Sequence, residues 1–228
     1  MTTSAKRGER FFPLFAWFLL LFVVGSFGGR ALFAAGNLPP LTWLHHAHAV
    51  AMLSWFALFA LQPTLIHLGK VDTHRLLGRL SPVVVLAFIG FGLSISKLNW
   101  QRIGEPLVAT ANGVNLLWFA GLYVAAIAWR RHAATHKRLM VYASLMLMGP
   151  AAGRIPEIFG QPSLLAVPLM LGMQLAPLLN DIVVHRRVHP ATWVGLSLAL
   201  ASILVILGLG GSDAWVAVLE EVLGPPGE

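Results

Sequence analysis

Three histidines in this chain are followed directly by a basic residue, and the other six are not: His74-Arg75, His136-Lys137 and His185-Arg186. The three pairs fall in alternate gaps between long apolar segments, so we expect them on one side of a membrane. Imidazole titrates near neutral pH and ligates metals, and guanidinium groups pair with anions. The spacing therefore predicts one face of the protein that carries polar chemistry.

Two of these histidines are the sharpest candidates for a cofactor site. Thr73 and Thr135 are expected N-caps, which would place His74 and His136 in the first turn of two helices. The helix dipole there disfavours imidazolium and keeps each ring neutral, as a metal or haem ligand must be. The expected ligand is a metal ion or haem b. Three arginines could pair with its anionic groups, such as haem propionates: Arg75, Arg79 and Arg138. The alternative is that all these residues are interfacial anchors.

A second pattern overlaps the first, because His132/His136 and His185/His189 both have HxxxH spacing. That spacing resembles the di-iron ligands of membrane desaturases and hydroxylases, which would make the protein a histidine-ligated metal enzyme. Thr135 as a cap and Pro190 directly after His189 argue against either pair lying on one continuous helix.

Polar residues are also expected on the opposite face. His48 lies in a histidine-rich helix start, and Asn112 and Asn115 share one helical face. Together they could line an outer cavity for a quinone headgroup, a proton or a small solute. The alternative is packing, since amides at membrane depth hydrogen-bond across helices.

Three charged residues are predicted to be buried: Arg154, Glu157 and Asp181. Only 15 residues separate Arg138 from Arg154, so a straight helix between them covers about 22 Å of a core about 30 Å thick. We therefore expect Arg154 to point into the bundle, with Glu157 at i+3 as a partner. Asp181 is expected within reach of Arg75 or Arg138.

The elements that position these residues follow from composition. The chain of 228 residues is 57% hydrophobic and 11% charged, too few charges for a soluble surface. Uncharged runs near the roughly 20 residues needed to cross a bilayer predict an all-α membrane protein in a single domain. Seven transmembrane helices are expected, followed by an outer tail at 212–228: 11–33, 43–66, 78–96, 106–130, 138–157, 162–182 and 191–211.

The distribution of the 16 lysines and arginines predicts the orientation. Twelve lie at the N-terminus and in alternate gaps, and four lie on the opposite side. This asymmetry predicts a bacterial inner-membrane protein with a cytoplasmic N-terminus and a periplasmic C-terminus. The net charge of +7 then reflects orientation and anionic lipid rather than nucleic acid. The absence of cysteine excludes disulfides, iron–sulfur clusters and thiol catalysis.

The chain also contains an internal repeat. Trp55-Phe56 recurs as Trp118-Phe119, and Thr73-His74-Arg75 recurs as Thr135-His136-Lys137. The four helices expected between residues 43 and 157 are therefore predicted to form two similar hairpins, of the kind that often bracket a central site in membrane proteins.

The segment His48-x6-Trp55-x6-Gln62-x11-His74-Arg75-x2-Gly78-Arg79, followed by His136-Lys137-Arg138-Leu139-Met140 and Arg154, carries a resemblance over about half the chain. It resembles a set of uncharacterised bacterial multi-span membrane proteins, which implies a membrane fold and no particular activity. A looser resemblance is to ascorbate-reducing b-type cytochromes, which hold two haems by histidines on four consecutive helices. Here Asn112 stands where the fourth histidine is expected, so the resemblance implies one haem.

Four functions remain open from the sequence. They are a haem-b or quinone-linked redox protein, an accessory or scaffold subunit without catalysis, a small-solute or lipid carrier, and a histidine-ligated metal enzyme. The lipid bilayer is the expected partner in each case. Quinone or other membrane proteins remain candidate partners, and the oligomeric state is not indicated.

Overall fold

The computed structural model describes the backbone of residues 3–33, 36 and 41–226, and the side chains of these from Arg10 onward, Ser163 excepted. This part of the chain is all-helical, as predicted. It contains six helices long and apolar enough to cross a membrane: Arg10–Phe33, Trp43–His67, Val71–Ile103, Pro106–Ala128, Leu164–His185 and Pro190–Gly210. The chain is therefore a polytopic membrane protein.

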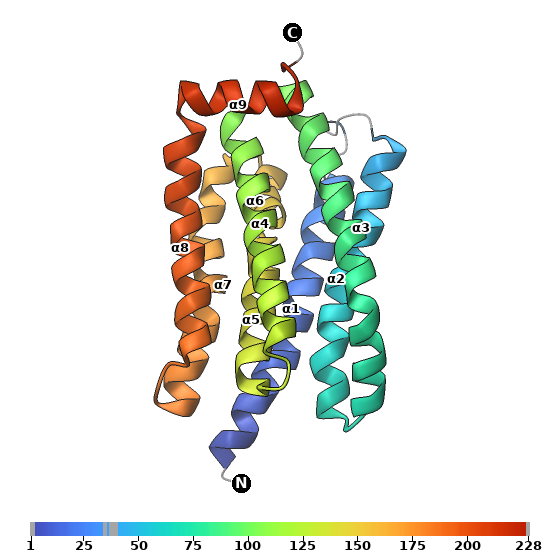
Figure 1. Ribbon diagram of the computed structural model, residues 1–228, viewed down its shortest axis with the longest axis vertical. Helices are drawn as coiled ribbons and strands as arrows, with labels where there is room; N and C mark the ends of the chain where they lie inside the picture. The colour runs from blue at the N-terminus through green and yellow to red at the C-terminus, as the bar shows by residue number, and fades with distance from the viewer. Residues whose placement is uncertain (1–2, 34–35, 37–40, 227–228) are drawn as a thin grey trace.

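The helices run along a common direction, with the two termini at opposite ends (Figure 1). The first four are α1 (Thr3–Phe33), α2 (Trp43–His67), α3 (Val71–Ile103) and α4 (Pro106–Ala128). They are followed by α5 (Ala133–Met146), α6 (Gly149–Ile158), a 3₁₀ turn η2 (Ser163–Ala166), α7 (Val167–Asn180), a π-helical turn η3 (Asp181–His185) and α8 (Pro190–Gly210). A last helix, α9 (Asp213–Leu223), lies across the end opposite the N-terminus.

The prediction of a single helix at 138–157 is wrong. The structure divides it into α5 and α6, with a break at Leu147 and Met148. Pro150 explains the break, since it has no N–H to donate and its ring would collide with the carbonyl of residue 146 in a continuous helix. Each piece is too short to count as a span, so six candidate spans stand where seven were expected. Figure 1 places α5 toward the N-terminal end of the molecule and α6 toward the opposite end.

The prediction that Thr73 and Thr135 are helix N-caps is also wrong. Helix α3 begins at Val71 after Lys70, and α5 begins at Ala133 after His132. Both threonines therefore lie inside the first turn. The expected position of the histidines holds nevertheless, because His74 is the fourth residue of α3 and His136 the fourth of α5.

The expected outer tail contains an ordered amphipathic helix. The hydroxyl oxygen of Ser212 accepts a hydrogen bond from the Trp215 N–H (3.3 Å) and caps α9. The indole of Trp215 donates to Thr110 of α4 (2.8 Å), and that of Trp100 on α3 donates to the carbonyl of Gly224 (2.7 Å). The helix is therefore held against α3 and α4.

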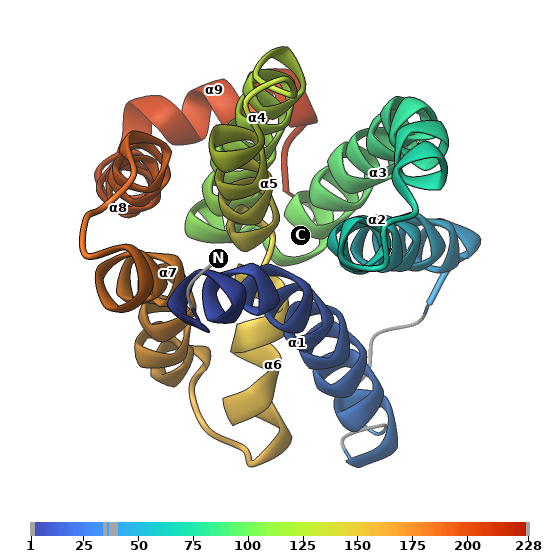
Figure 2. The ribbon, with the colours of Figure 1, turned by 90° about the horizontal axis from the view of Figure 1, so that it is seen from below.

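The packing of the bundle places α2 against α3 and α4 against α5, with α8 next to α4 and α5. Figure 2 shows these neighbours around the long axis. Phe56 and Phe119, one from each proposed repeat, are fully buried, whereas Trp55 is buried and Trp118 only half-buried. The equivalence of the two hairpins remains a prediction.

Candidate functional site

His74 and His136 each lie near the start of a helix, at the end of the molecule where α3 and α5 begin (Figure 1). The Nδ1 atom of His136 lies 2.8 Å from the carbonyl oxygen of Ala126 on α4, and Nδ1 of His74 lies 3.4 Å from the carbonyl oxygen of Gln62 on α2. A carbonyl only accepts hydrogen bonds, so the short contact of His136 is made by an Nδ1–H donor, which in a neutral ring leaves the lone pair on Nε2. The Nδ1 of His74 also faces the side-chain amide of Gln62, which can donate to it, so the tautomer of His74 is not fixed by the carbonyl alone.

Gln62 contacts His74 through its side chain as well as through its backbone carbonyl. With its side-chain nitrogen facing His74, Gln62 donates to Nδ1 of His74 and to the His74 carbonyl oxygen (3.2 Å), and its side-chain oxygen accepts from the Gly78 N–H (3.1 Å). The end of α2 and the first turns of α3 are thus fastened together around this ring.

An aromatic cluster lies on the same helical faces, farther along the helices. Trp55 packs edge-on against Phe119 (5.0 Å between ring centroids) and Tyr123 (5.7 Å). The Tyr123 hydroxyl shares a hydrogen bond of 2.7 Å with Ser81. Ser81 follows His74 by seven residues, so it lies on the same face of α3, about 10 Å farther along the helix.

The second polar feature is a buried ion pair between α5 and η3. Nε of Arg138 donates to both carboxylate oxygens of Asp181 at 3.1 Å, and Nη2 of Arg138 also donates to this carboxylate. Asp181 additionally accepts from the Thr192 hydroxyl (2.6 Å) and the His189 N–H (3.1 Å). Both charged groups are fully buried. This confirms the expected reach of Asp181 to Arg138, and it commits Arg138 to Asp181 rather than to a cofactor.

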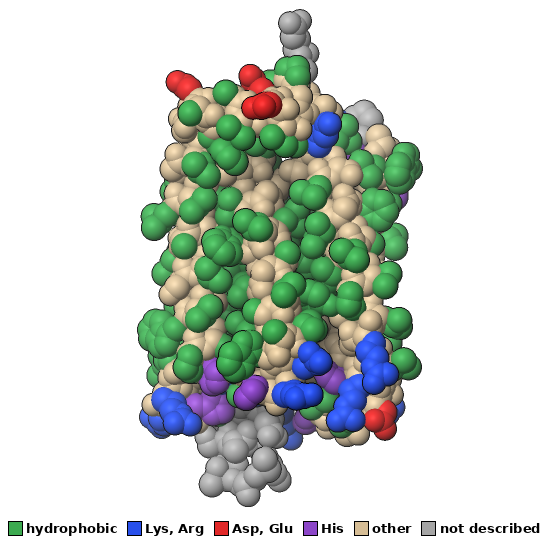
Figure 3. All heavy atoms as spheres, viewed as in Figure 1, with side chains coloured by type: hydrophobic (Ala, Val, Ile, Leu, Met, Phe, Trp, Pro, Cys, Tyr) green, Lys and Arg blue, Asp and Glu red, His purple; other side chains and the backbone are tan. Residues whose placement is uncertain are grey.

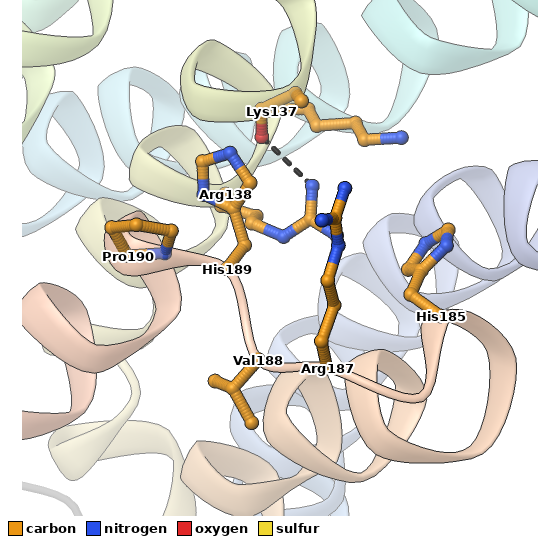
Figure 4. Close-up of a pocket in the computed structure, with 8 residues that line it drawn as sticks. Lys137, Arg138, His185, Arg187, Val188, His189 and Pro190 are labelled. Carbon is orange, nitrogen blue, oxygen red and sulfur yellow. Dashed lines mark hydrogen bonds between the residues drawn. The ribbon is translucent and has the colours of Figure 1, made fainter.

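A cavity of about 630 Å³ opens beside this ion pair (Figure 4). Figure 4 shows Arg187 and His189 extending from the loop before α8 toward α5. Within the described chain, the lining residues combine basic and small apolar side chains: Ala134, Lys137, Arg138, His185, Arg187, Val188, His189 and Pro190. It lies at the end of the molecule where lysine, arginine and histidine side chains gather in Figure 3.

His189 lines this cavity and also caps α8. Its Nδ1 accepts from the Ala191 N–H (3.1 Å), which caps α8 and puts the ring proton on Nε2. Burial lowers the pKa of His189, and the nearby Arg138 lowers it further. The ring is therefore neutral near pH 7.

The two remaining arginines of the expected cofactor site are exposed on α3. Arg75 is 3.8 Å from Asp72, a weak contact between exposed side chains, and Arg79 has no ion pair among the described residues. Both remain able to bind an anionic group near His74.

The expected outer cavity is not formed by the three residues as a group. Asn112 lines a hollow of only about 10 Å³ near Trp100, room for about one water molecule. His48 instead stacks on Phe88 (5.5 Å), and its buried Nδ1 has no hydrogen-bond partner among the described residues. Asn115 is half-buried on α4.

The charges of α6 are paired differently from expectation. Glu157 forms an ion pair with Arg30 of α1 (2.9 Å) rather than with Arg154. Arg154 donates to the Pro150 carbonyl (2.6 Å) and its guanidinium lies 4.0 Å from the centroid of the Phe27 ring. Arg154 therefore faces α1. The sequence did not indicate Phe27 as the contact of Arg154, nor Arg30 as the partner of Glu157.

The HxxxH pairs do not form helical ligand sets. His132 precedes α5, and Arg186, in the left-handed conformation (φ 56°), ends η3 directly after His185. No group of three or more His, Asp or Glu side chains suited to a metal ion occurs in the described residues.

Gln62 and Thr192 are site residues that sequence reasoning did not place in these roles. In the sequence, Gln62 was noted as part of the motif that carries the family resemblance, and Thr192 was not singled out. Their roles depend on contacts between separate helices, which spacing within one helix does not predict.

Comparison with models of protein families, with curated proteins and with solved structures found no match to this chain. The fold and the polar end together define it as a helical, multi-pass membrane protein.

Proposed function

We propose that this protein is a membrane redox protein that binds one haem b, which His74 and His136 would hold. The proposal is carried by one observation: at the same position of two helices, each ring has its Nδ1 next to a carbonyl oxygen of the preceding helix, at 2.8 Å for His136 and 3.4 Å for His74.

Hydrogen bonds of this kind are characteristic of ligating histidines. A carbonyl that accepts from Nδ1–H fixes the ring orientation and the tautomer, and it raises the basicity of Nε2. No described side chain or carbonyl bonds to either Nε2, so both remain available as ligands. Haem b between two imidazoles supplies reversible one-electron transfer.

The surroundings of the two rings suit a flat apolar group with anionic substituents. Helices α3 and α5 pack mainly on other helices rather than on each other. Trp55, Phe119 and Tyr123 form an aromatic cluster farther along the same helices. Arg75 and Arg79 are the arginines that would pair with propionates, because Arg138 is occupied by Asp181.

We further propose that α5 and α6 together make one membrane crossing. With the six candidate spans this gives seven crossings, a cytoplasmic N-terminus and a periplasmic C-terminus in a bacterial inner membrane. The two termini at opposite ends and the lysines and arginines gathered at the N-terminal end (Figure 3) support this orientation. A membrane quinone is the electron partner we favour.

A small-solute carrier is the second candidate, favoured by the break between α5 and α6. Discontinuous helices often form transport sites. Ser144 lies just before the break, and its buried hydroxyl has no hydrogen-bond partner in the described structure. Gln174 on α7 has a buried side-chain oxygen that is likewise unpaired.

Haem titration tests the two candidates. Purified protein titrated with haemin should develop a Soret band that saturates at one haem per chain. His74→Ala and His136→Ala should abolish it, whereas His132→Ala, at the same end of the molecule, should not. The haem proposal is contradicted if His74→Ala and His136→Ala bind haem to the same extent as the wild type. If the wild-type protein binds no haem, the carrier is favoured.

A further inference from the structure

The cavity beside Arg138 is separate from the histidine pair and has its own chemistry. Its walls come from the first turn of α5, from η3 and from the loop that leads into α8. At about 630 Å³ its volume is typical of small-molecule sites, which span about 300–1,000 Å³. It is therefore large enough for an organic ligand.

The charge of the cavity is positive. Asp181 is the carboxylate next to it, but that group is fully buried and accepts from Arg138, Thr192 and the His189 N–H. Its charge is thus matched by Arg138. Among the described residues, Arg187 belongs to none of the ion pairs, and its exposed guanidinium extends over the opening (Figure 4).

The donors are held in place by the fold. Asp181 fixes the loop at the His189 N–H and fixes the start of α8 at the Thr192 hydroxyl. Because Nδ1 of His189 caps α8, its proton lies on Nε2 and can be donated to a ligand. Arg186 holds the left-handed conformation that turns the chain between His185 and Arg187. The loop is therefore shaped before any ligand binds.

We propose that this cavity binds a phosphate-bearing molecule, with Arg187, His185 and His189 as the contacting residues. A guanidinium group binds phosphate oxygens in a two-point geometry, and neighbouring imidazole N–H groups add further donors. The phosphate belongs either to the headgroup of an anionic lipid or to a water-soluble phosphomonoester. Both sources share this recognition chemistry.

Thermal unfolding of the full chain in detergent tests the proposal. Three probes are added separately: phosphatidylglycerol, phosphatidylcholine at the same mole fraction, and glycerol 3-phosphate. A ligand at about 100 times its Kd should raise the Tm by roughly 5 °C. We expect phosphatidylglycerol or glycerol 3-phosphate to raise the Tm of the wild type and phosphatidylcholine to have no such effect.

The variants separate a built site from general attraction to anions. Arg187→Gln and His185→Gln change exposed side chains, so both should fold. Arg131→Gln is the matched control, an exposed arginine at the same end that does not line the cavity. The proposal requires the shift to be lost in Arg187→Gln, reduced in His185→Gln and retained in Arg131→Gln.

The pattern of shifts identifies the source of the phosphate. A shift with phosphatidylglycerol alone indicates a lipid site, and a shift with glycerol 3-phosphate indicates a soluble ligand. The proposal is overturned if neither probe stabilises the wild type, or if Arg131→Gln loses as much of the shift as Arg187→Gln.

Discussion

Arg138 and Asp181 form an ion pair in which both side chains are buried, with Nε of the arginine 3.1 Å from each carboxylate oxygen. The pair joins α5 to the turn before α8, and Thr192 and the His189 N–H complete the bonding of the carboxylate. It fixes the polar end of the bundle, next to the cavity that Arg138, Arg187 and His189 line.

Substitution of one partner should be costly. Asp181→Asn removes the charge that matches Arg138, and breaking a buried pair from one side typically costs about 3–5 kcal/mol. Thr192→Val removes a single hydrogen bond to the same carboxylate and should cost about 1.5–3 kcal/mol. Thermal and denaturant unfolding in detergent measure both. Equal losses for the two variants would show that the carboxylate charge is not the dominant contribution.

His189 should make stability depend on pH. Its folded pKa lies below the ordinary value of 6.5, so folding favours the neutral ring. This contribution is fully present above about pH 6.5 and is lost as the pH falls toward the folded pKa, because the unfolded chain then binds the proton more readily. Wild type should therefore lose more stability between pH 7 and pH 5 than His189→Asn, whose side chain can still cap α8. Parallel pH profiles for the two proteins would contradict this assignment.

Gly195 permits the close approach of α8 to α5. A Cβ atom at this position would lie 2.1 Å from the ring of Tyr142, which is fully buried. Gly195→Ala should therefore destabilise the protein by about 1–3 kcal/mol through overpacking. Gly208→Ala is the control on the same helix, since a Cβ there meets no atom within 4 Å. That variant should be neutral or slightly stabilising, because alanine favours a helix more than glycine does. A similar loss in both variants would mean that the contact with Tyr142 does not decide the effect.

Membrane topology is testable independently of any cofactor. Reporter fusions in the turn between α4 and α5, at Arg130 or Arg131, should show a cytoplasmic location, and fusions after α9 should show a periplasmic one. A cytoplasmic signal after α9 would mean that α5 and α6 do not complete a crossing.

The sequence predicted the long helices well because each is a long apolar run bounded by charges. It failed at 138–157, where the apolar run was read as one helix although Pro150 was visible. The first-turn positions of His74 and His136 were predicted from Thr73 and Thr135 as N-caps, and they hold although both helices begin two residues before these threonines. The pairing of Arg138 with Asp181 was expected in outline, whereas the pairing of Glu157 with Arg30 was not, because it joins helices far apart in sequence.

The central claim is that His74 and His136 together ligate one haem iron. The most direct measurement is electron paramagnetic resonance of the oxidised, haem-loaded protein, with the haem content determined on the same sample. Wild-type protein should carry one haem per chain with the low-spin signal of two imidazole ligands, and His136→Ala should convert any remaining haem to a high-spin form. A low-spin signal that survives in both His74→Ala and His136→Ala, or wild-type protein that binds no haem, would contradict the account.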